Sequence, residues 1–211
     1  RLRWDRIHPV TPPHALPRAR AVVDLAAVRG NVERLRAAAP TADVMAVVKA
    51  DAYGHGLVPC ARAALDGGAR WLGVALPEEA FALRAAGIDA PVLAWLLTPG
   101  DDESLRRAVA EGIDLSASDV GTVGAVAAAG RALGAPARLQ LKVDTGLSRG
   151  GASRADSMTR LKRLLDAGVT SFLDLTEEDE LPSYHTLLPE LTERPIRYRR
   201  LSITDHSIPE S

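Results

Sequence analysis

The ten residues VVKADAYGHG, Val47 to Gly56, combine a primary amine, a phenol and an imidazole with two glycines. Lys49 ends an apolar run typical of a buried strand, and a lysine becomes a Schiff-base nucleophile when partial desolvation lowers its pKa. The phenol of Tyr53 could hydrogen-bond a phosphate oxygen, and glycines allow the backbone to approach a ligand closely. Spacing alone leaves two interpretations of Lys49 open, a nucleophile on a rigid base or a surface lysine before an ordinary turn. His55 is read as a packing or hydrogen-bonding histidine.

Elements that could position this motif recur along the chain from about residue 20. Apolar runs typical of parallel strands cover residues 43–49, 71–76, 91–97, 113–118 and 137–144. Helical patterns separate them, which indicates successive βα units and a parallel sheet. No Rossmann glycine fingerprint is present, and a complete eight-unit barrel needs ~250 residues. We therefore predict an α/β fold, a partial (β/α)8 TIM-type barrel, followed by a short α/β segment of different origin.

The ends of several predicted helices carry recognisable signals. Asp24 can cap a helix whose apolar residues follow a spacing of three and four. Pro77 followed by two glutamates suits a first helical turn. Ser118 and Asp119 can open a further helix that ends near Gly134. These signals support the alternation of strands and helices.

Composition excludes several functional classes. The formal net charge of -1 argues against binding to nucleic acid, and no apolar run reaches the ~18–20 residues that span a membrane. The single cysteine, Cys60, rules out an internal disulfide and fits a cytoplasmic protein; we expect it to be a small buried hydrophobe. His185 and His206 lack metal-ligand spacing, so no metal site is predicted. Residues 1–20 lack an apolar signal-peptide core and are interpreted as a flexible leader.

Three stretches together resemble the alanine racemase family. AVVKADAYGHG (residues 46–56) resembles the family's pyridoxal-phosphate lysine motif. AVVDLAAVRGNVERLRA (residues 21–37) resembles its entry helix, and LKVDTGLSRGG (residues 141–151) resembles its second barrel signature. The three occur in the family's order within residues 21–152, which makes the resemblance more specific than a lone lysine motif.

The resemblance implies roles for individual residues. Lys49 would form the Schiff base with the cofactor pyridoxal 5′-phosphate and act as one acid/base group, and Tyr53 would hold the cofactor phosphate. Arg149 would lie near the cofactor's phenolic oxygen and bind the substrate carboxylate. Lys142 resembles the family's lysine that is often carbamylated, and a carbamate there would be an anion able to orient Arg149. For Asp144 a turn or capping role is expected.

The reaction implied is a 1,1-proton transfer that interconverts L-alanine and D-alanine, with the cofactor as electron sink. Inversion needs a base on each face of the α-carbon, and Lys49 would serve one face. The family's opposing tyrosine comes from a C-terminal domain of the partner subunit, so a homodimer is expected. Nothing in this sequence matches that domain, and we expect the isolated chain to be inactive. The alternative is a PLP-binding barrel protein without racemase activity.

The tail, residues 154–211, resembles the N-terminal half of a dual-specificity or tyrosine-phosphatase-like domain. The resemblance lies in GVTSFLDLTEEDEL (residues 168–181) and RYRRLSITDHSIP (residues 197–209). It implies that Asp205 is a general acid, although a turn role for this aspartate stays open. A truncated phosphatase-like chain is thus a second alternative. The predicted organisation is a leader (1–20), a partial PLP barrel (21–152) and an incomplete phosphatase-like segment (153–211).

Overall fold

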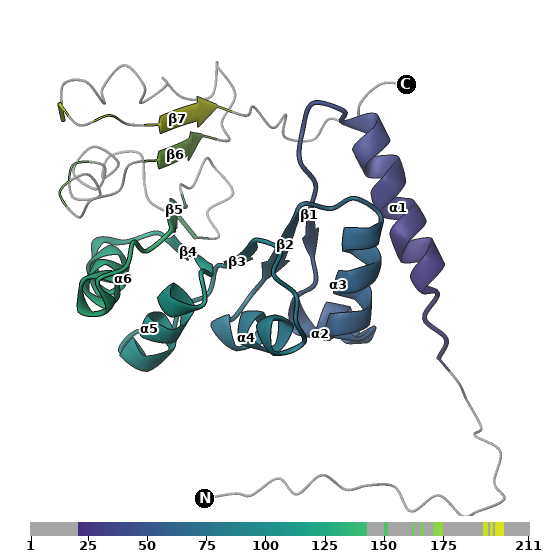
Figure 1. Cartoon of the computed structure of the whole chain (residues 1–211), viewed down its shortest axis with the longest axis horizontal. Helices are drawn as coiled ribbons and strands as arrows, with labels where there is room; N and C mark the ends of the chain where they lie inside the picture. Colours follow the sequence, from purple (N-terminus) through teal and green to yellow (C-terminus); the bar gives the residue numbers. More distant parts are fainter. Residues whose placement is uncertain are drawn as a thin grey trace, which may run out of the picture.

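Five short parallel strands form the central sheet of the computed structural model, which describes residues 21–142, 150, 151, 162, 166, 171–174, 192, 193, 195 and 197–200. The strands are β1 (Met45–Val47), β2 (Trp71–Val74), β3 (Val92–Ala94), β4 (Asp114–Ala117) and β5 (Leu139–Leu141). They lie in the order β1-β2-β3-β4-β5, and every neighbouring pair is parallel (Figure 1). Consecutive neighbours joined by helices are the arrangement of a (β/α) barrel, so the predicted strands and their pairing are confirmed.

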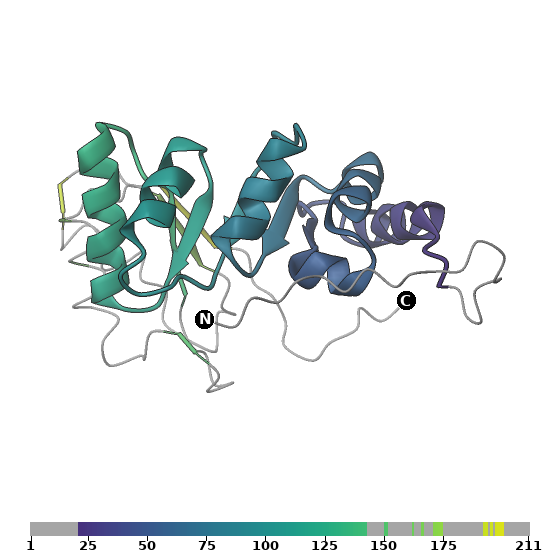
Figure 2. The same cartoon turned by 90° about the horizontal axis from the view of Figure 1, so that it is seen from below.

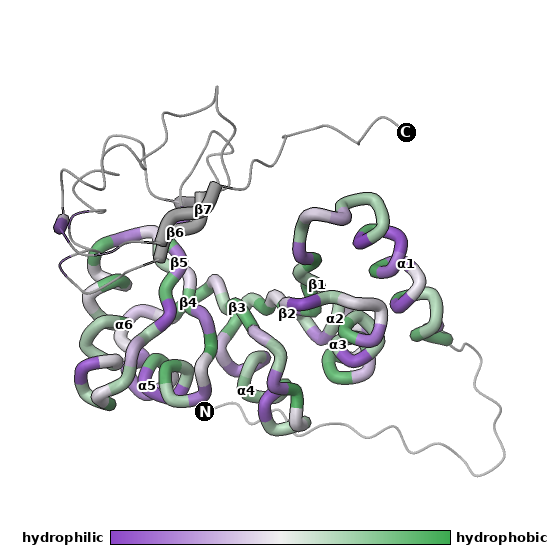
Figure 3. Tube along the Cα trace, turned by 45° about the horizontal axis from the view of Figure 1, so that its top comes forward, coloured by the Kyte–Doolittle hydropathy of each residue, from purple (hydrophilic) through white to green (hydrophobic). Residues whose placement is uncertain are grey.

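Helices cover one face of this sheet. They are α1 (Leu25–Ala38), α3 (Leu57–Asp66), α4 (Pro77–Ala85), α5 (Asp102–Ala110) and α6 (Val120–Leu133). Figure 2 shows them side by side in chain order, and Figure 3 shows hydrophobic and hydrophilic residues alternating along α4, α5 and α6. Beneath them, Leu72, Val74, Val92 and Leu115 are completely buried. These outward-facing strand residues form the centre of the core.

The helices begin where the sequence predicts. Asp24 accepts hydrogen bonds from the backbone N–H groups of Ala26 and Ala27, at 2.9 and 3.1 Å. Asp119 caps α6 in the same way, and Gly134 ends that helix with a φ of +61°. Such caps satisfy backbone groups that a helix end leaves without partners.

Cys60 lies in α3 and is 4% exposed, which confirms the prediction of a small buried hydrophobe. Burial raises the pKa of its thiol, and the nearby charge of Asp51 raises it further. A thiol with a raised pKa is a poor nucleophile.

The opposite face of the sheet is less covered. Gly73 stands at its centre, where an added Cβ would lie 2.9 Å from the Trp95 ring and 3.2 Å from the sulfur of Met45. Val47, paired with Gly73 on β1, is 43% exposed. This face corresponds to the interior of a barrel, of which the described strands form one side.

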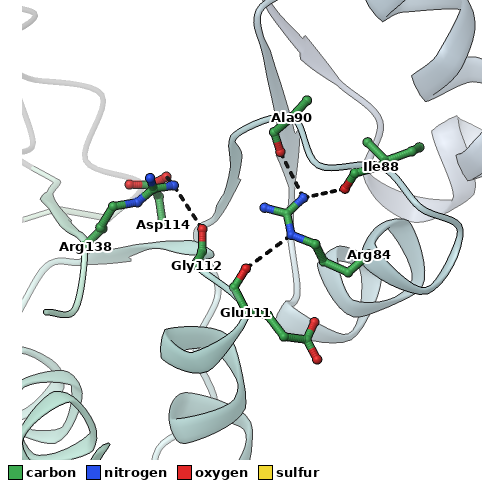
Figure 4. A network of polar contacts seen from close by, with 7 residues as sticks. All are labelled: Arg84, Ile88, Ala90, Glu111, Gly112, Asp114 and Arg138. Carbon is green, nitrogen blue, oxygen red and sulfur yellow. Dashed lines mark hydrogen bonds and ion pairs between the residues drawn. The ribbon is translucent and has the colours of Figure 1, made fainter. Parts of the chain in front are cut away.

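Two arginine side chains form hydrogen bonds near the amino ends of β3 and β4 (Figure 4). The Arg84 guanidinium donates hydrogen bonds to the carbonyl oxygens of Ile88, Ala90 and Glu111, at 2.6, 2.9 and 3.2 Å. Since these carbonyls belong to the loops that lead into β3 and β4, one side chain connects two successive βα units.

Arg138, just before β5, likewise connects neighbouring βα units. It donates hydrogen bonds to the carbonyl oxygen of Gly112, at 2.9 Å, and to the carboxylate of Asp114, at 2.6 Å. Burial raises the pKa of Asp114, and the charges of Arg138 and Arg84 offset part of that rise. The buried carboxylate and its arginine therefore tie β4 to the start of β5.

The second part of the chain contributes β6 (Ser171–Asp174) and β7 (Arg197–Arg200), which pair in parallel. The stretches VTSFLDL (residues 169–175) and IRYRRLSI (residues 196–203) are predicted as strands from their sequences, and β6 and β7 lie within them. The stretch RADSMTRLKRLLDAG (residues 154–168) is predicted as a helix from its sequence, and only residues 162 and 166 of it are described. The helix predicted for YHTLLPEL (residues 184–191) and the leader at 1–20 lie outside the described residues. No helix in the described part of the chain is both long and apolar enough to cross a membrane.

Candidate functional site

Lys49 lies just beyond the carboxyl end of β1. The strand ends at Val47, Val48 continues the pairing by donating its N–H to the carbonyl oxygen of Gly73 at 2.9 Å, and Lys49 opens α2 (Lys49–Gly54). The prediction that Lys49 ends a buried strand is therefore corrected in two respects. The lysine belongs to the turn after the strand, and β1 is partly exposed because it forms an edge of the described sheet.

The α2 turn is left-handed. Four successive residues, Ala50 to Tyr53, have φ between +52° and +58°, and none of them is glycine. L-residues lose roughly 1–2 kcal/mol each in this conformation. Residues in such a strained conformation persist only where surrounding contacts hold them, and they cluster at functional sites. Sequence reasoning missed the turn, because alanine, aspartate and tyrosine give no local signal for positive φ.

Backbone and side-chain hydrogen bonds hold the turn from both ends. The N–H of Ala52 donates to the carbonyl oxygen of Val48 at 2.8 Å, and Ala52 itself is buried. The carboxylate of Asp51 accepts from the N–H of Leu57 at 2.6 Å, while its carbonyl oxygen accepts from Gly56 at 2.9 Å. Asp51 thus links the turn to the first residue of α3, a role that sequence reasoning also missed.

A third link comes from α4. The carboxylate of Glu79 accepts a hydrogen bond from the N–H of Ala50, at 2.5 Å. The same carboxylate accepts from the N–H groups of Ala75 and Leu76, at 2.9 and 3.0 Å. Glu79 was predicted only as part of a first helical turn, and no local pattern marks its contact with residue 50.

The turn brings Lys49 and Tyr53 together. The ammonium nitrogen of Lys49 lies 5.6 Å from the centroid of the Tyr53 ring, within the range of a cation–π contact. Lys49 is half-buried, whereas Tyr53 is 63% exposed. His55 is exposed, and its Nδ1 lies 2.8 Å from the carbonyl oxygen of Ala52, so this histidine makes a local hydrogen bond.

Lys142 occupies the same edge of the sheet at its other end. It follows β5, and its N–H donates to the carbonyl oxygen of Ala117 at 2.8 Å. Its side chain is exposed, and its ammonium lies 3.8 Å from the position that a Cβ on Gly150 would take. Lys49 and Lys142 therefore both follow carboxyl ends of parallel strands, where barrel enzymes place their catalytic groups. The other predicted site residues, Arg149, Asp144 and Asp205, lie outside the described residues.

The described residues at this edge fit the cofactor that the resemblance implies. A half-buried primary amine sits on a turn held by three sets of hydrogen bonds, next to an accessible phenol. The amine can form a covalent link to an aldehyde, and the phenol can donate to a phosphate.

Comparison with known proteins extends these observations. The family model described as "Alanine racemase, N-terminal domain" matches residues 23–185 of this chain. Alanine racemase of Frankia casuarinae is 58% identical over 139 residues, which are 66% of this chain and 36% of that protein. Alanine racemase of Streptomyces coelicolor is 54% identical over 151 residues, 70% of this chain and 38% of that protein. The chain thus spans less than two fifths of the length of these two relatives.

Solved structures show the same likeness. A crystal structure of alanine racemase from Streptomyces lavendulae superimposes with a TM-score of 0.72 at 42% identity, covering 84% of this chain and 51% of that one. A histidine racemase from Leuconostoc mesenteroides gives a TM-score of 0.67 at 26% identity, with 83% of this chain and 50% of that chain covered. These likenesses confirm the partial TIM-type barrel.

The predicted phosphatase resemblance of residues 154–211 is not supported. The match to the alanine racemase domain continues beyond residue 152 to residue 185, which includes the whole stretch GVTSFLDLTEEDEL and all of β6. The proposed boundary near residue 152 stays a prediction.

Proposed function

The chain belongs to the alanine racemase family, and from this premise we propose that it carries the cofactor lysine of an isomerase that interconverts L-alanine and D-alanine. The observation that carries the proposal is the placement of Lys49 on a braced left-handed turn at the carboxyl edge of a parallel barrel sheet. A family match over residues 23–185 supports the reaction class.

Lys49 and Tyr53 are the described residues that would hold pyridoxal 5′-phosphate. When bound, this cofactor supplies an electron sink for the negative charge that develops on the substrate α-carbon. Lys49 would hold the cofactor covalently through Nζ, and the phenol of Tyr53 would donate a hydrogen bond to the phosphate. The exposure of Tyr53 supports this role, because a phosphate group must reach the phenol.

The proton transfer places two demands on the protein. Lys49 Nζ would take or give the proton on one face of the α-carbon, and the braced turn limits the directions in which this amine can point. The opposite face needs a second base, which we assign to a partner subunit of a homodimer. Arg149 would bind the carboxylate of alanine, and a carbamate on Lys142 would orient Arg149. We also propose that the protein is located in the cytoplasm.

Addition of pyridoxal 5′-phosphate tests the cofactor assignment. The chain has only three lysines, Lys49, Lys142 and Lys162, so reductive trapping can be assigned without ambiguity. We expect a new absorbance band near the visible edge, loss of that band on borohydride reduction, and a cofactor label on the peptide that contains residue 49. Lys49→Ala should abolish all three, whereas Lys162→Ala, which removes an exposed lysine, should change none.

Racemisation of L-alanine, followed by circular dichroism or a chiral assay, tests the reaction. D-alanine formation that requires Lys49 would support the proposal in full. Because nothing in this sequence matches the domain that carries the opposing base, we expect a cofactor band without D-alanine formation for this chain alone. The alternative, a PLP-binding barrel protein without racemase activity, predicts the same result, so only D-alanine formation separates the two. Failure to label residue 49 at saturating cofactor would overturn both.

A further inference from the structure

Glu79 makes contacts that its place in α4 does not require. A glutamate at the third position of a helix commonly reaches back to the backbone N–H at the helix start. One carboxylate oxygen of Glu79 does this, accepting from Leu76 at 3.0 Å and also from Ala75 at 2.9 Å. The other oxygen accepts from Ala50 at 2.5 Å, a residue 29 positions earlier in the chain. Helix capping accounts for the hydrogen bonds of the first oxygen, but it does not account for the hydrogen bond that the second oxygen accepts from Ala50.

The two oxygens join the carboxyl ends of neighbouring strands. Ala50 follows β1, and Ala75 follows β2, its parallel neighbour. Hydrogen bonds between ionised carboxylates and backbone N–H groups are short and strong compared with those between neutral groups. Glu79 therefore ties the turn after β1 to the fixed end of β2.

The two sides of this link differ in how firmly the core holds them. On the α4 side, Pro77, Ala80 and Leu83 are buried, so the carboxylate extends from an anchored helix. On the α2 side, Ala50 and its neighbour Asp51 are exposed. The N–H of Ala50 is the first donor of the left-handed stretch and immediately follows Lys49. An anchored carboxylate thus reaches the backbone beside the lysine.

We propose that Glu79 is a positioning residue that fixes the direction of Lys49 through the backbone of Ala50. Its consequence for the cofactor rests on the proposed function, whereas the brace itself is a property of the protein without cofactor. Both carboxylate oxygens of Glu79 are needed, because one serves each strand end. Glu79→Gln retains a single acceptor oxygen and can brace only one end at a time.

The first experiment measures amide hydrogen exchange in the full chain without cofactor. Glu79→Gln should speed exchange of the Ala50 amide by about tenfold, because the charge-assisted hydrogen bond between Glu79 and this amide is lost. Asp119→Ala is the matched control, since it removes another carboxylate cap, whose Oδ1 accepts from Thr122 at 2.9 Å. It should speed exchange at Thr122 and leave Ala50 unchanged. Equal exchange at Ala50 in wild type and Glu79→Gln would overturn the brace.

The second experiment follows the cofactor. In Glu79→Gln the dissociation constant of pyridoxal 5′-phosphate should rise about tenfold, and the pH at which the absorbance band titrates should shift. Asp119→Ala should alter neither, even though it also loses a helix cap. The same result for both variants would show that Glu79 acts through stability alone and would overturn the positioning role.

The two proposals fail in distinguishable ways. If wild-type protein takes up no cofactor on Lys49, the proposed function fails while the exchange experiment still tests the brace. If wild type binds cofactor and Glu79→Gln leaves the exchange, the affinity and the titration unchanged, the positioning role fails and the proposed function stands.

Discussion

The ammonium nitrogen of Lys49 lies 5.6 Å from the centroid of the Tyr53 ring, across a turn in which the four residues after Lys49 are left-handed. The left-handed path turns the chain back so that residues four apart face one another, as they do on a helix. An amine and a phenol from one short segment therefore meet at the carboxyl edge of the sheet.

Tyr53 can be tested with two substitutions that separate its hydroxyl from its ring. Tyr53→Phe should weaken binding of pyridoxal 5′-phosphate by about tenfold, because a hydrogen bond to a charged phosphate is lost. Tyr53→Ala should weaken it further, since the cation–π contact with Lys49 is lost as well. Cofactor titration followed by absorbance measures both. Equal affinity for wild type and Tyr53→Phe would contradict a phosphate contact.

Ala50 should tolerate glycine unusually well. Its φ of +54° is costly for alanine and free for glycine, so Ala50→Gly should raise the free energy of unfolding by about 1 kcal/mol after the entropic cost of glycine. Ala82, an exposed alanine inside α4, is the control. Ala82→Gly should lower the free energy of unfolding by about 1 kcal/mol. Urea denaturation of both variants decides the matter, and a loss of stability in Ala50→Gly would contradict a strained turn.

Gly73 makes room for the side chains on the inner face of the sheet. An added Cβ would lie 2.9 Å from the Trp95 ring and 3.3 Å from a methyl group of Val47. Gly73→Ala should therefore lower the free energy of unfolding by about 1–3 kcal/mol and shift the tryptophan fluorescence.

Gly124 is the control for this substitution, because it lies in α6 with no atom within 4 Å of an added Cβ. Gly124→Ala should raise the free energy of unfolding by about 1 kcal/mol through better helix propensity. Unchanged fluorescence and stability in Gly73→Ala would show that Trp95 is not held against this position.

Asp114 predicts a pH dependence of stability. Burial raises its pKa above 3.8 in the folded protein, and the charges of Arg138 and Arg84 offset only part of that rise. Folding therefore raises the proton affinity of this carboxyl, so its contribution to stability grows as pH falls toward 3.8 and is lost as pH rises through the folded pKa. The comparison is with Asp114→Asn, which cannot titrate.

The free energy of unfolding of wild type, relative to that of Asp114→Asn, should increase as the pH is lowered from neutral to 3.8. Urea denaturation at each pH measures this difference. Replacing the carboxylate by an amide also changes the hydrogen bonding of Arg138, so the slope with pH and not the absolute difference carries the test. An opposite slope would mean that Arg138 outweighs burial and lowers the pKa of Asp114.

The elements of the fold were predictable because their signals are local. Asp24 and Asp119 cap helices through their own neighbours in sequence, and β2, β3 and β4 lie in short apolar runs typical of parallel strands. Resemblance alone added the roles of Lys49 and Tyr53. The phosphatase interpretation of the tail, by contrast, is not supported, because the racemase-domain match continues to residue 185.

The sequence by itself determined the strands, the helix starts and the presence of an amine and a phenol four residues apart. Only the tertiary structure decided that Lys49 stands on a left-handed turn and that Glu79 reaches the N–H of Ala50. The reason is physical. No local preference of alanine, aspartate or tyrosine favours positive φ, so the conformation depends on hydrogen bonds from elements that are distant in sequence and adjacent only after the sheet has formed.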